Sequence, residues 1–123
     1  MTDNVNRETV TRWVESYRRV WESNEPDDIR ALFTEDGEYF AEPWAEPWRG
    51  QDAIVESWLE ARDEPGDTTF EWEIVAVDGN NAVVRAITDY VEESTYYNVW
   101  VIRFGDDGRA TTFTEWYMKQ DPA

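Results

Sequence analysis

Apolar residues recur at helical spacing in the first half of the chain and at every second position in the second half. Residues 6–23 predict a helix whose apolar stripe is formed by Val10, Trp13, Val14, Tyr17 and Trp21. Pro26 suits the first turn of a second, short helix, and a third helix is expected to begin near Gly50. Residues 38–41 predict a brief strand between the second and third helices.

From Thr68 onward the period changes to two, which is typical of strands with one buried face. The predicted strands are residues 69–77, 82–91, 95–104 and 109–118. Short turns separate them, and short turns join antiparallel neighbours. The chain of 123 residues therefore predicts a single α+β domain over residues 1–123, with three helices packed on a mostly antiparallel sheet.

The charge balance excludes several classes of partner. The chain has 28 acidic and 11 basic residues, a net charge of −17, and neither His nor Cys. Nucleic acids and anionic membranes are unfavourable partners, because both require a surplus of Lys and Arg. The absence of thiols and imidazoles removes cysteine nucleophiles, histidine bases and nearly all zinc sites, so we assign no metal and no cofactor. The amino-terminal sequence shows no secretory signal and no run approaches a membrane span, so a cytoplasmic protein is expected.

The acidic surplus also suggests a salt-rich environment. Lys119 is the only lysine, and an acid-rich, lysine-poor composition resembles that of cytosolic proteins from halophiles. Molar salt would screen the self-repulsion of such a chain. The alternative is an ordinary acidic protein from a mesophile.

The order of elements resembles the nuclear transport factor 2-like superfamily, which includes ketosteroid isomerase and SnoaL-like polyketide cyclases. The segments that carry the resemblance cover nearly the whole chain: VTRWVESYRRVWES, DDIRALFTEDGEYF, WRGQDAIVESW and NVWVIRFGDDGRATTFTEWYMK. The resemblance implies a cone-shaped (cystatin-like) fold, in which a strongly curved sheet wraps over helices and a pocket opens between them. Because this fold carries enzymes, binding modules and assembly domains, it does not by itself define the function.

Alternation along the predicted strands sorts side chains into two faces. The resemblance implies that the Glu115 set of the last strand points inward, which also turns Asn98 and Trp100 inward. The facing of residues 82–91 stays open. We expect Val84, Ala86, Val99, Val101 and Trp116 to form an apolar outer face. That face predicts a homodimer through the sheet, unless another part of the chain covers it.

Three residues are candidates for acid/base chemistry. The resemblance places Glu42 where ketosteroid isomerases carry their proton-shuttling base, and Tyr17 where they carry an oxyanion-hole tyrosine. The second oxyanion donor of that family, a protonated Asp, corresponds to Trp100, and this departure argues against an identical steroid isomerase. Glu115, if inward, is desolvated and has a raised pKa, unless Arg85 neutralises it.

Each candidate also has a purely structural interpretation. Glu42 is either a base or a solvated loop residue, Tyr17 either a pocket donor or a core residue, and Glu115 either catalytic or a structural hydrogen-bond acceptor. Trp44 and Trp48 of the Glu-Pro-Trp doublet form either the lip of a pocket or a cap on the core. The further candidates for ligand binding are Trp72, Arg85, Asn98, Trp100, Phe113 and Tyr117.

These features predict a SnoaL-like pocket protein that binds a small, mainly apolar molecule. If it is an enzyme, it catalyses a cofactor-free proton transfer (an isomerisation, dehydration or cyclisation), with Glu42 as base, Tyr17 as donor and Glu115 as a tuned acid. The alternative is a non-catalytic binding or assembly domain of the same fold.

Overall fold

The computed structural model describes residues 6–41, 44–60, 68–90 and 95–119. Helix α1 (Arg7–Ser23) begins after Asn6, whose side chain accepts the Thr9 backbone N–H at 2.9 Å. It ends at Asn24, whose φ of 52° stops the helix and whose N–H returns to the Val20 carbonyl. Its buried side chains are Val10, Trp13, Val14, Tyr17 and Val20, so all of the predicted stripe except the half-buried Trp21 lies in the core.

The other two helices are shorter. Helix α2 (Pro26–Ala31) has Pro26 in its first turn, as the sequence predicted, and buries Ile29. Helix α3 (Gln51–Glu60) follows two strands rather than α2, so the three helices precede the meander but do not form an uninterrupted amino-terminal block. Across the described ranges, no helix is long and apolar enough to cross a membrane.

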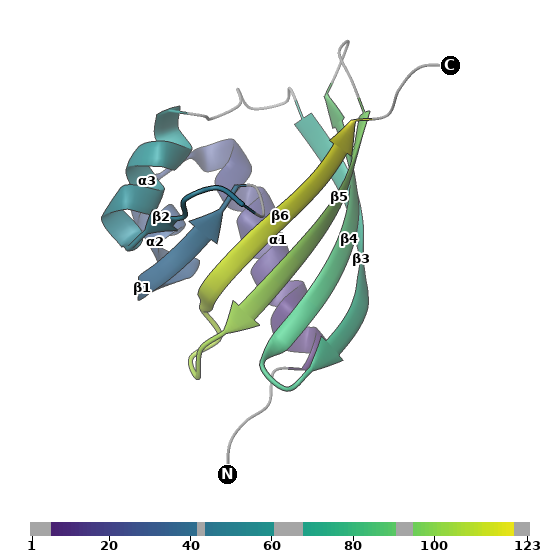
Figure 1. Ribbon diagram of the computed structural model, residues 1–123, viewed down its shortest axis with the longest axis horizontal. Helices are drawn as coiled ribbons and strands as arrows, with labels where there is room; N and C mark the ends of the chain where they lie inside the picture. The colour runs from purple at the N-terminus through teal and green to yellow at the C-terminus, as the bar shows by residue number, and fades with distance from the viewer. Residues whose placement is uncertain (1–5, 42–43, 61–67, 91–94, 120–123) are drawn as a thin grey trace.

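A six-stranded sheet with the order β2-β1-β6-β5-β4-β3 forms the rest of the molecule (Figure 1). Its strands are β1 (Phe33–Phe40), β2 (Trp48–Arg49), β3 (Thr68–Asp78), β4 (Asn81–Tyr90), β5 (Thr95–Phe104) and β6 (Ala110–Lys119). The last four are the predicted antiparallel meander, whereas β1 pairs with β6 in parallel. This parallel pairing brings the early part of the chain beside its end.

Strand β1 is longer than the sequence predicted, and β2 was not predicted. The segment 34–37 belongs to β1 instead of simply ending the second helix. The pairing of β1 with β6 shifts register between Phe33 and Glu38, and Gly37 lies in this irregular stretch. A Cβ at Gly37 would lie 3.1 Å from the Thr34 carbonyl oxygen, so any other residue there would have to displace the neighbouring backbone slightly.

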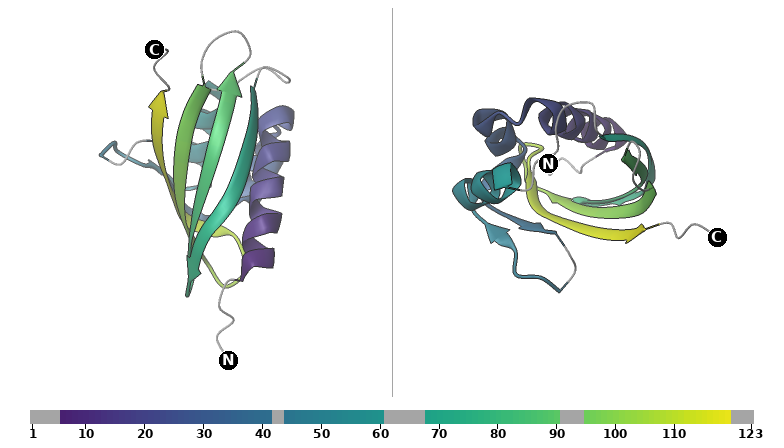
Figure 2. Two further views of the ribbon diagram at one scale, coloured as in Figure 1. Left: turned by 90° about the vertical axis from the view of Figure 1, so that its right-hand side faces the viewer. Right: turned by 90° about the horizontal axis from the view of Figure 1, so that it is seen from above.

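The sheet curves around α1, which lies against its concave, inner face (Figure 2). The buried core lies between them and is rich in aromatic rings. Trp13, for example, stacks on Tyr17 at a centroid distance of 5.2 Å and on Phe113 at 5.7 Å. Because α1 packs large rings against the sheet, most of the inner face is buried, whereas Glu115 near the end of β6 stays half-buried.

Two residues predicted on the outer face of the sheet lie on the inner face. Val84 and Ala86 are 0% and 1% exposed, because β4 directs Ala82, Val84, Ala86 and Thr88 inward. The outer face instead exposes Ile87, Tyr97, Val99 and Trp116, each between 37% and 46%, with Val101 half-buried. The apolar outer face therefore persists with a partly different membership.

Candidate functional site

Glu115 lies on the inner face of β6, directly opposite Trp100 of β5. The Trp100 indole donates Nε1–H to Glu115 Oε2 at 3.0 Å. The Asn98 amide, also on β5, donates to the same oxygen at 2.8 Å. Two neutral donors therefore fix one oxygen of this carboxyl group.

Thr88 extends this arrangement to a third strand. Its Oγ1 donates to Asn98 Oδ1 at 2.6 Å, and both residues are buried, at 1% and 5% exposure. We name Thr88, Asn98, Trp100 and Glu115 the inner polar cluster. Its members lie on adjacent strands β4, β5 and β6, where inward side chains of neighbouring strands meet.

Burial raises the pKa of the Glu115 carboxyl above its usual value. The hydrogen bonds from Trp100 and Asn98 act in the opposite direction, because they stabilise the charged form, but they only partly offset the loss of hydration. The group is therefore easier to protonate than a surface glutamate, which is what a side chain that exchanges protons near neutral pH requires.

Tyr17 is buried in the core, near enough to Glu115 for the two groups to interact electrostatically. Its hydroxyl is 3.3 Å from the Tyr39 hydroxyl, and either oxygen can be the donor. Burial, and then the proximity of Tyr39 and Glu115, raise the pKa of Tyr17 well above its usual value. Tyr17 therefore stays a neutral hydroxyl, which can act as a hydrogen-bond donor but not as a base.

Aromatic rings surround these polar groups. Centroid distances from the Tyr17 ring are 5.3 Å to Phe113, 5.4 Å to Trp100 and 5.5 Å to Trp58. Phe113 in turn stacks on Tyr39 at 4.8 Å. The predicted candidates Tyr17, Phe113, Trp100, Asn98 and Glu115 are thus brought together on the inner side of the sheet.

Arg85 does not belong to this group, and the prediction that it lines the pocket is wrong. It lies on the outer face of β4 and forms an ion pair with Glu73, with 2.7 Å between Nη2 and Oε1. Glu73 is its direct cross-strand neighbour on β3. Because a sheet separates Arg85 from Glu115, Arg85 does not neutralise that carboxyl.

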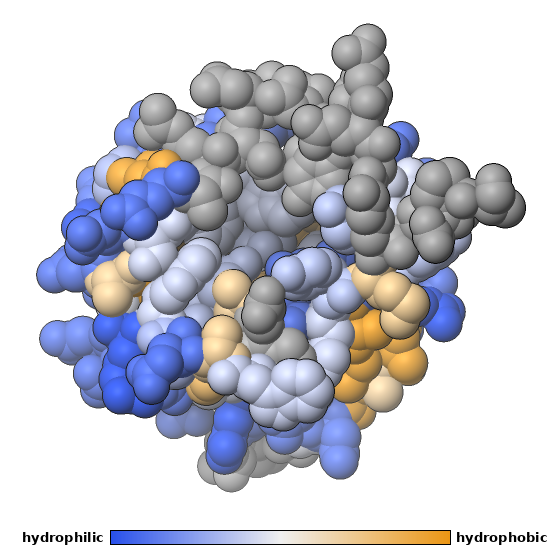
Figure 3. Space-filling view, turned by 45° about the horizontal axis from the view of Figure 1, so that its top comes forward, coloured by the Kyte–Doolittle hydropathy of each residue, from blue (hydrophilic) through white to orange (hydrophobic). Residues whose placement is uncertain are grey.

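The remaining predicted residues lie at the periphery. Trp48 stacks on Tyr39 at 4.5 Å, whereas Trp44 is 96% exposed. Trp72 is half-buried against the core, and Tyr117 is 50% exposed on β6. Glu42, the predicted base, lies outside the described residues, so its position relative to Glu115 stays a prediction. Figure 3 shows a mostly hydrophilic surface that is hollowed near the middle of the view, beside the grey segments.

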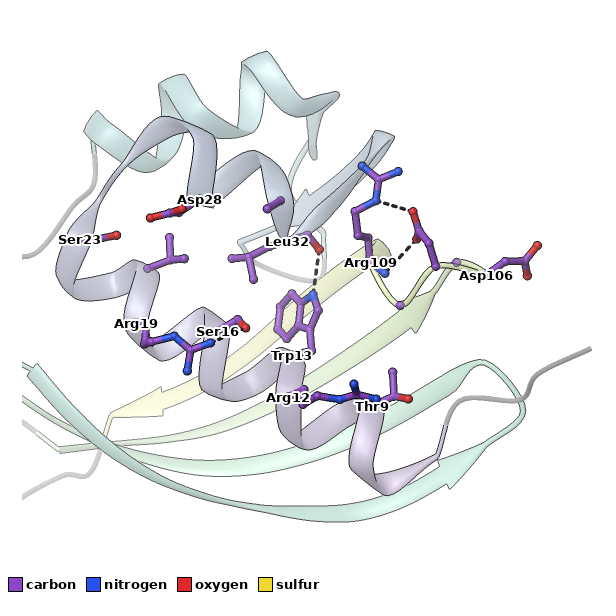
Figure 4. A pocket seen from close by; sticks show the side chains of 15 residues that line it. Thr9, Arg12, Trp13, Ser16, Arg19, Ser23, Asp28, Leu32, Asp106 and Arg109 are labelled. Atoms are coloured by element: carbon purple, nitrogen blue, oxygen red, sulfur yellow. Dashed lines mark hydrogen bonds and ion pairs between the residues drawn. The ribbon is translucent and has the colours of Figure 1, made fainter.

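A separate groove of about 770 Å³ lies between α1, α2 and the turn at residues 105–109 (Figure 4). On its floor, the Trp13 indole donates Nε1–H to the Leu32 carbonyl oxygen at 2.8 Å. On its rim, Asp107 Oδ2 accepts a hydrogen bond from Arg109 Nε at 2.6 Å. The hydrogen bonds from the Arg109 backbone N–H and side chain lower the pKa of the Asp107 carboxyl. A carboxylate held in its charged form is a poor proton donor, so Asp107 is a weaker candidate for acid/base chemistry than Glu115.

Two members of the site were not found from the sequence. Thr88 lies on the strand whose facing the alternation left open, and only the inward direction of Val84 and Ala86 reveals it. Tyr39 was placed in a brief strand without a role, although it is buried and its hydroxyl adjoins that of Tyr17. Within the ranges that the structure describes, no three His, Cys, Asp or Glu side chains gather closely enough to hold a metal ion.

Comparisons with known proteins agree with this architecture. The chain is similar in structure to a candidate ketosteroid isomerase from Kribbella flavida DSM 17836, with a TM-score of 0.73, 19% identity, and coverage of 100% of this chain and 85% of the other. It is also similar to SalBIII, an epoxide hydrolase/cyclase-like enzyme of salinomycin pyran ring formation, with a TM-score of 0.71, 18% identity, and coverage of 96% and 95%. For an LEH-like epoxide hydrolase from M. tuberculosis the TM-score is 0.62 at 17% identity, with coverage of 90% of this chain and 84% of the other.

These likenesses confirm the predicted nuclear transport factor 2-like (cystatin-like) fold, and at such identities they establish only the fold. No curated protein is significantly similar in sequence. The family model of the SnoaL-like domain, however, matches residues 14–113, a range that contains Tyr17, Thr88, Asn98 and Trp100 but ends before Glu115. The chain therefore belongs to the SnoaL-like domain family.

Proposed function

We propose that the protein binds a small, mainly apolar molecule at the inner face of its sheet and exchanges a proton with it through Glu115. The observation that supports this most directly is the inner polar cluster: a carboxyl with a raised pKa that accepts hydrogen bonds from two neutral donors on one oxygen, one of them the Trp100 indole of the aromatic core. Aromatic walls with a few convergent polar groups suit an apolar ligand that carries a polar atom.

The chemistry that fits these groups is a proton transfer without a cofactor. Protonated Glu115 would donate to an oxygen of the ligand, and the neutral Tyr17 hydroxyl would stabilise charge on that oxygen. A base must then take a proton from carbon, and Glu42 remains the residue proposed for that role. If the proton taken from carbon returns to another carbon of the ligand, the net result is an isomerisation. If the oxygen protonated by Glu115 is a hydroxyl that leaves as water, the result is a dehydration. If the deprotonated carbon attacks a carbonyl carbon of the same ligand, whose oxygen takes the proton of Glu115, the result is a cyclisation.

A second candidate function is a non-catalytic binding or assembly domain. Two observations favour it: an indole, Trp100, stands where the resemblance implies an acid, and the Tyr17 hydroxyl already adjoins that of Tyr39. In this case the hydrogen bonds within the inner polar cluster serve only to pair its own buried polar atoms.

Acetophenone, an aromatic ring with a single acceptor oxygen, is a suitable probe for the first function. We expect saturable changes in the NMR signals of the Trp100 indole N–H and the Asn98 amide. Glu115→Gln should weaken binding, whereas Glu71→Gln, which removes an exposed carboxylate from the outer face, should not. Native mass spectrometry of the purified protein would reveal a small molecule retained from the cell.

The carbon NMR titration of the Glu115 carboxyl separates the two candidates. A raised pKa is expected for the acid/base function. An ordinary glutamate pKa would remove that function and leave the binding or assembly domain.

The outer face of the sheet supports a homodimer in solution. Its exposed apolar residues, which include Tyr97, Val99 and Trp116, would be covered by the same face of a second copy. About 800 Å² buried on each subunit would reach the usual size of a stable interface. Sedimentation of a monomer at micromolar concentration would contradict this proposal.

The surplus of carboxylates supports a cytoplasmic protein adapted to high salt. At a net charge of −17, screening by molar KCl should stabilise the folded state. A melting temperature that stays constant between dilute buffer and molar KCl would contradict the adaptation.

A further inference from the structure

We propose that Thr88 is a positioning residue for Glu115: its hydroxyl holds the Asn98 amide as a donor to Oε2 and thereby leaves Oε1 as the oxygen that exchanges the proton. The inference rests on the proposed proton-transfer function of Glu115. It concerns a residue that touches neither the carboxyl group nor the expected ligand position directly.

The side-chain amide of Asn98 can adopt two orientations, because rotation by half a turn exchanges its oxygen and its NH2 group. In the observed orientation Nδ2 is 2.8 Å from Glu115 Oε2, and Oδ1 is 2.6 Å from Thr88 Oγ1. Asn98 is only 5% exposed, so its oxygen has little access to water as an alternative partner. A buried acceptor without a donor costs about 1–3 kcal/mol, and the Thr88 hydroxyl removes this cost.

The two donors on Oε2 decide where a proton can bind. The Asn98 amide and the Trp100 indole both direct an N–H at Oε2. Among the residues that the structure describes, none donates a hydrogen bond to Oε1. When Glu115 is neutral, its proton therefore belongs on Oε1, and this single oxygen is the one offered to a ligand.

Thr88→Val tests the role of the hydroxyl, because valine keeps the branched shape and removes the donor. The Asn98 oxygen then lacks a partner, the amide shifts or turns towards water, and Glu115 loses a hydrogen bond that stabilises its charged form. We expect the proton affinity of Glu115 in the ligand-free protein to rise about tenfold, measured by carbon NMR of its carboxyl. Thr88→Ser, which keeps the hydroxyl, should restore the titration of the original protein.

Thr114→Val is the matched control. Thr114 precedes Glu115 on β6 but faces the outer side of the sheet, so the same chemical change there should leave the titration of Glu115 unchanged. A Thr88→Val protein in which Glu115 titrates as in the original would overturn the proposal. An equal change in Thr114→Val would also overturn it, since the effect would then not depend on the inner hydroxyl.

A measurement on the unaltered protein covers the case in which Thr88→Val does not fold. The two Asn98 Nδ2 protons should exchange slowly with water and their signals should shift as Glu115 titrates. Rapid exchange, or signals that do not respond to this titration, would contradict the positioning role.

Failure of this inference can be distinguished from failure of the proposed function. If the original protein binds acetophenone but Thr88→Val titrates normally, only the positioning role is lost. If Thr88→Val shifts the titration but no acetophenone binds, Thr88 orients the cluster and the proposed ligand class is wrong.

Discussion

On the outer face of the meander, Arg85 and Glu73 form an exposed ion pair across β3 and β4, with 2.7 Å between their nearest atoms. On the inner face of the same sheet, Glu115 has no cationic partner among the described side chains but accepts two neutral N–H groups from β5. The outer pair lies in water, where such pairs contribute about 0–1 kcal/mol to stability. The inner carboxyl has lost hydration, and its pKa is raised as a result.

The difference shows that the two faces treat a carboxylate in different ways. On the outer face a charged side chain is solvated, and an ion-pair partner adds little to the stability of the fold. On the inner face a charge is unfavourable, and the two donors reduce the penalty without removing it. A group in that state responds to pH and to nearby charge, and this is why we propose a functional rather than a stabilising role for Glu115.

The largest expected effect comes from two tryptophans on neighbouring strands that face opposite sides. Trp100 is 0% exposed and Trp116 is 45% exposed. Trp100→Ala should lower the free energy of unfolding by about 3–5 kcal/mol, because it leaves a cavity and removes a donor from Glu115. Trp116→Ala should cost about 1 kcal/mol or less in the monomer. Urea unfolding at several protein concentrations checks both values, and equal losses would contradict the assigned faces.

The next effect concerns the pH dependence of stability. Because the folded pKa of Glu115 is raised, the folded state binds this proton more tightly than the unfolded state does. Its contribution to stability is therefore complete below the unfolded pKa of a glutamate and is lost as the pH rises through the raised folded value. Glu115→Gln should abolish this part of the pH profile and make the protein relatively more stable on the alkaline side.

Glu71→Gln is the control for this pH profile, since it removes one negative charge from the exposed outer face. It should change the overall level of stability through reduced self-repulsion but retain the step assigned to Glu115. Thermal unfolding measured across the acidic and neutral range checks both variants. Parallel profiles for Glu115→Gln and the original protein would show that the inner carboxyl is not perturbed.

The smallest effect is expected for the outer ion pair. Arg85→Gln breaks the contact with Glu73, but both side chains are at least 60% exposed. We expect a change in the free energy of unfolding within about 0.5 kcal/mol and no change in the titration of Glu115. A shifted Glu115 titration in this variant would mean that charge is communicated across the sheet and would weaken the contrast between its faces.

The sequence predicted most elements because their patterns are local. Helix α1 and strands β3 to β6 begin and end within about two residues of their expected positions, since helical and alternating patterns extend over many residues there. Strand β1 was underestimated, because its irregular pairing around Gly37 breaks the alternation. The two-residue strand β2 has no pattern of its own and exists only through its pairing with β1.

The candidate site was only partly predictable. Alternation gave Glu115, Asn98 and Trp100 one common face, and the resemblance chose that face as the inner one. For β4, each face combines apolar and polar residues, so the pattern alone did not decide between Arg85 and Thr88. The register of β4 against β5 decides which of the two residues points inward. Ala86 lies opposite Asn98, and directly opposite residues of an antiparallel pair share a face, so Thr88 points inward with Ala86 and Arg85 points outward.

The sequence by itself determined the acidic charge, the lack of imidazole and thiol groups, the helical and alternating patterns, and thus the kind of chemistry that is open to this protein. Only the tertiary structure decided which side of β4 meets the core, that Arg85 lies in water, and that Thr88 joins Asn98 and Glu115. The physical reason is that burial and hydrogen bonding depend on the strands that lie alongside. A carboxyl group acquires its proton affinity from those neighbours and not from its position in the chain.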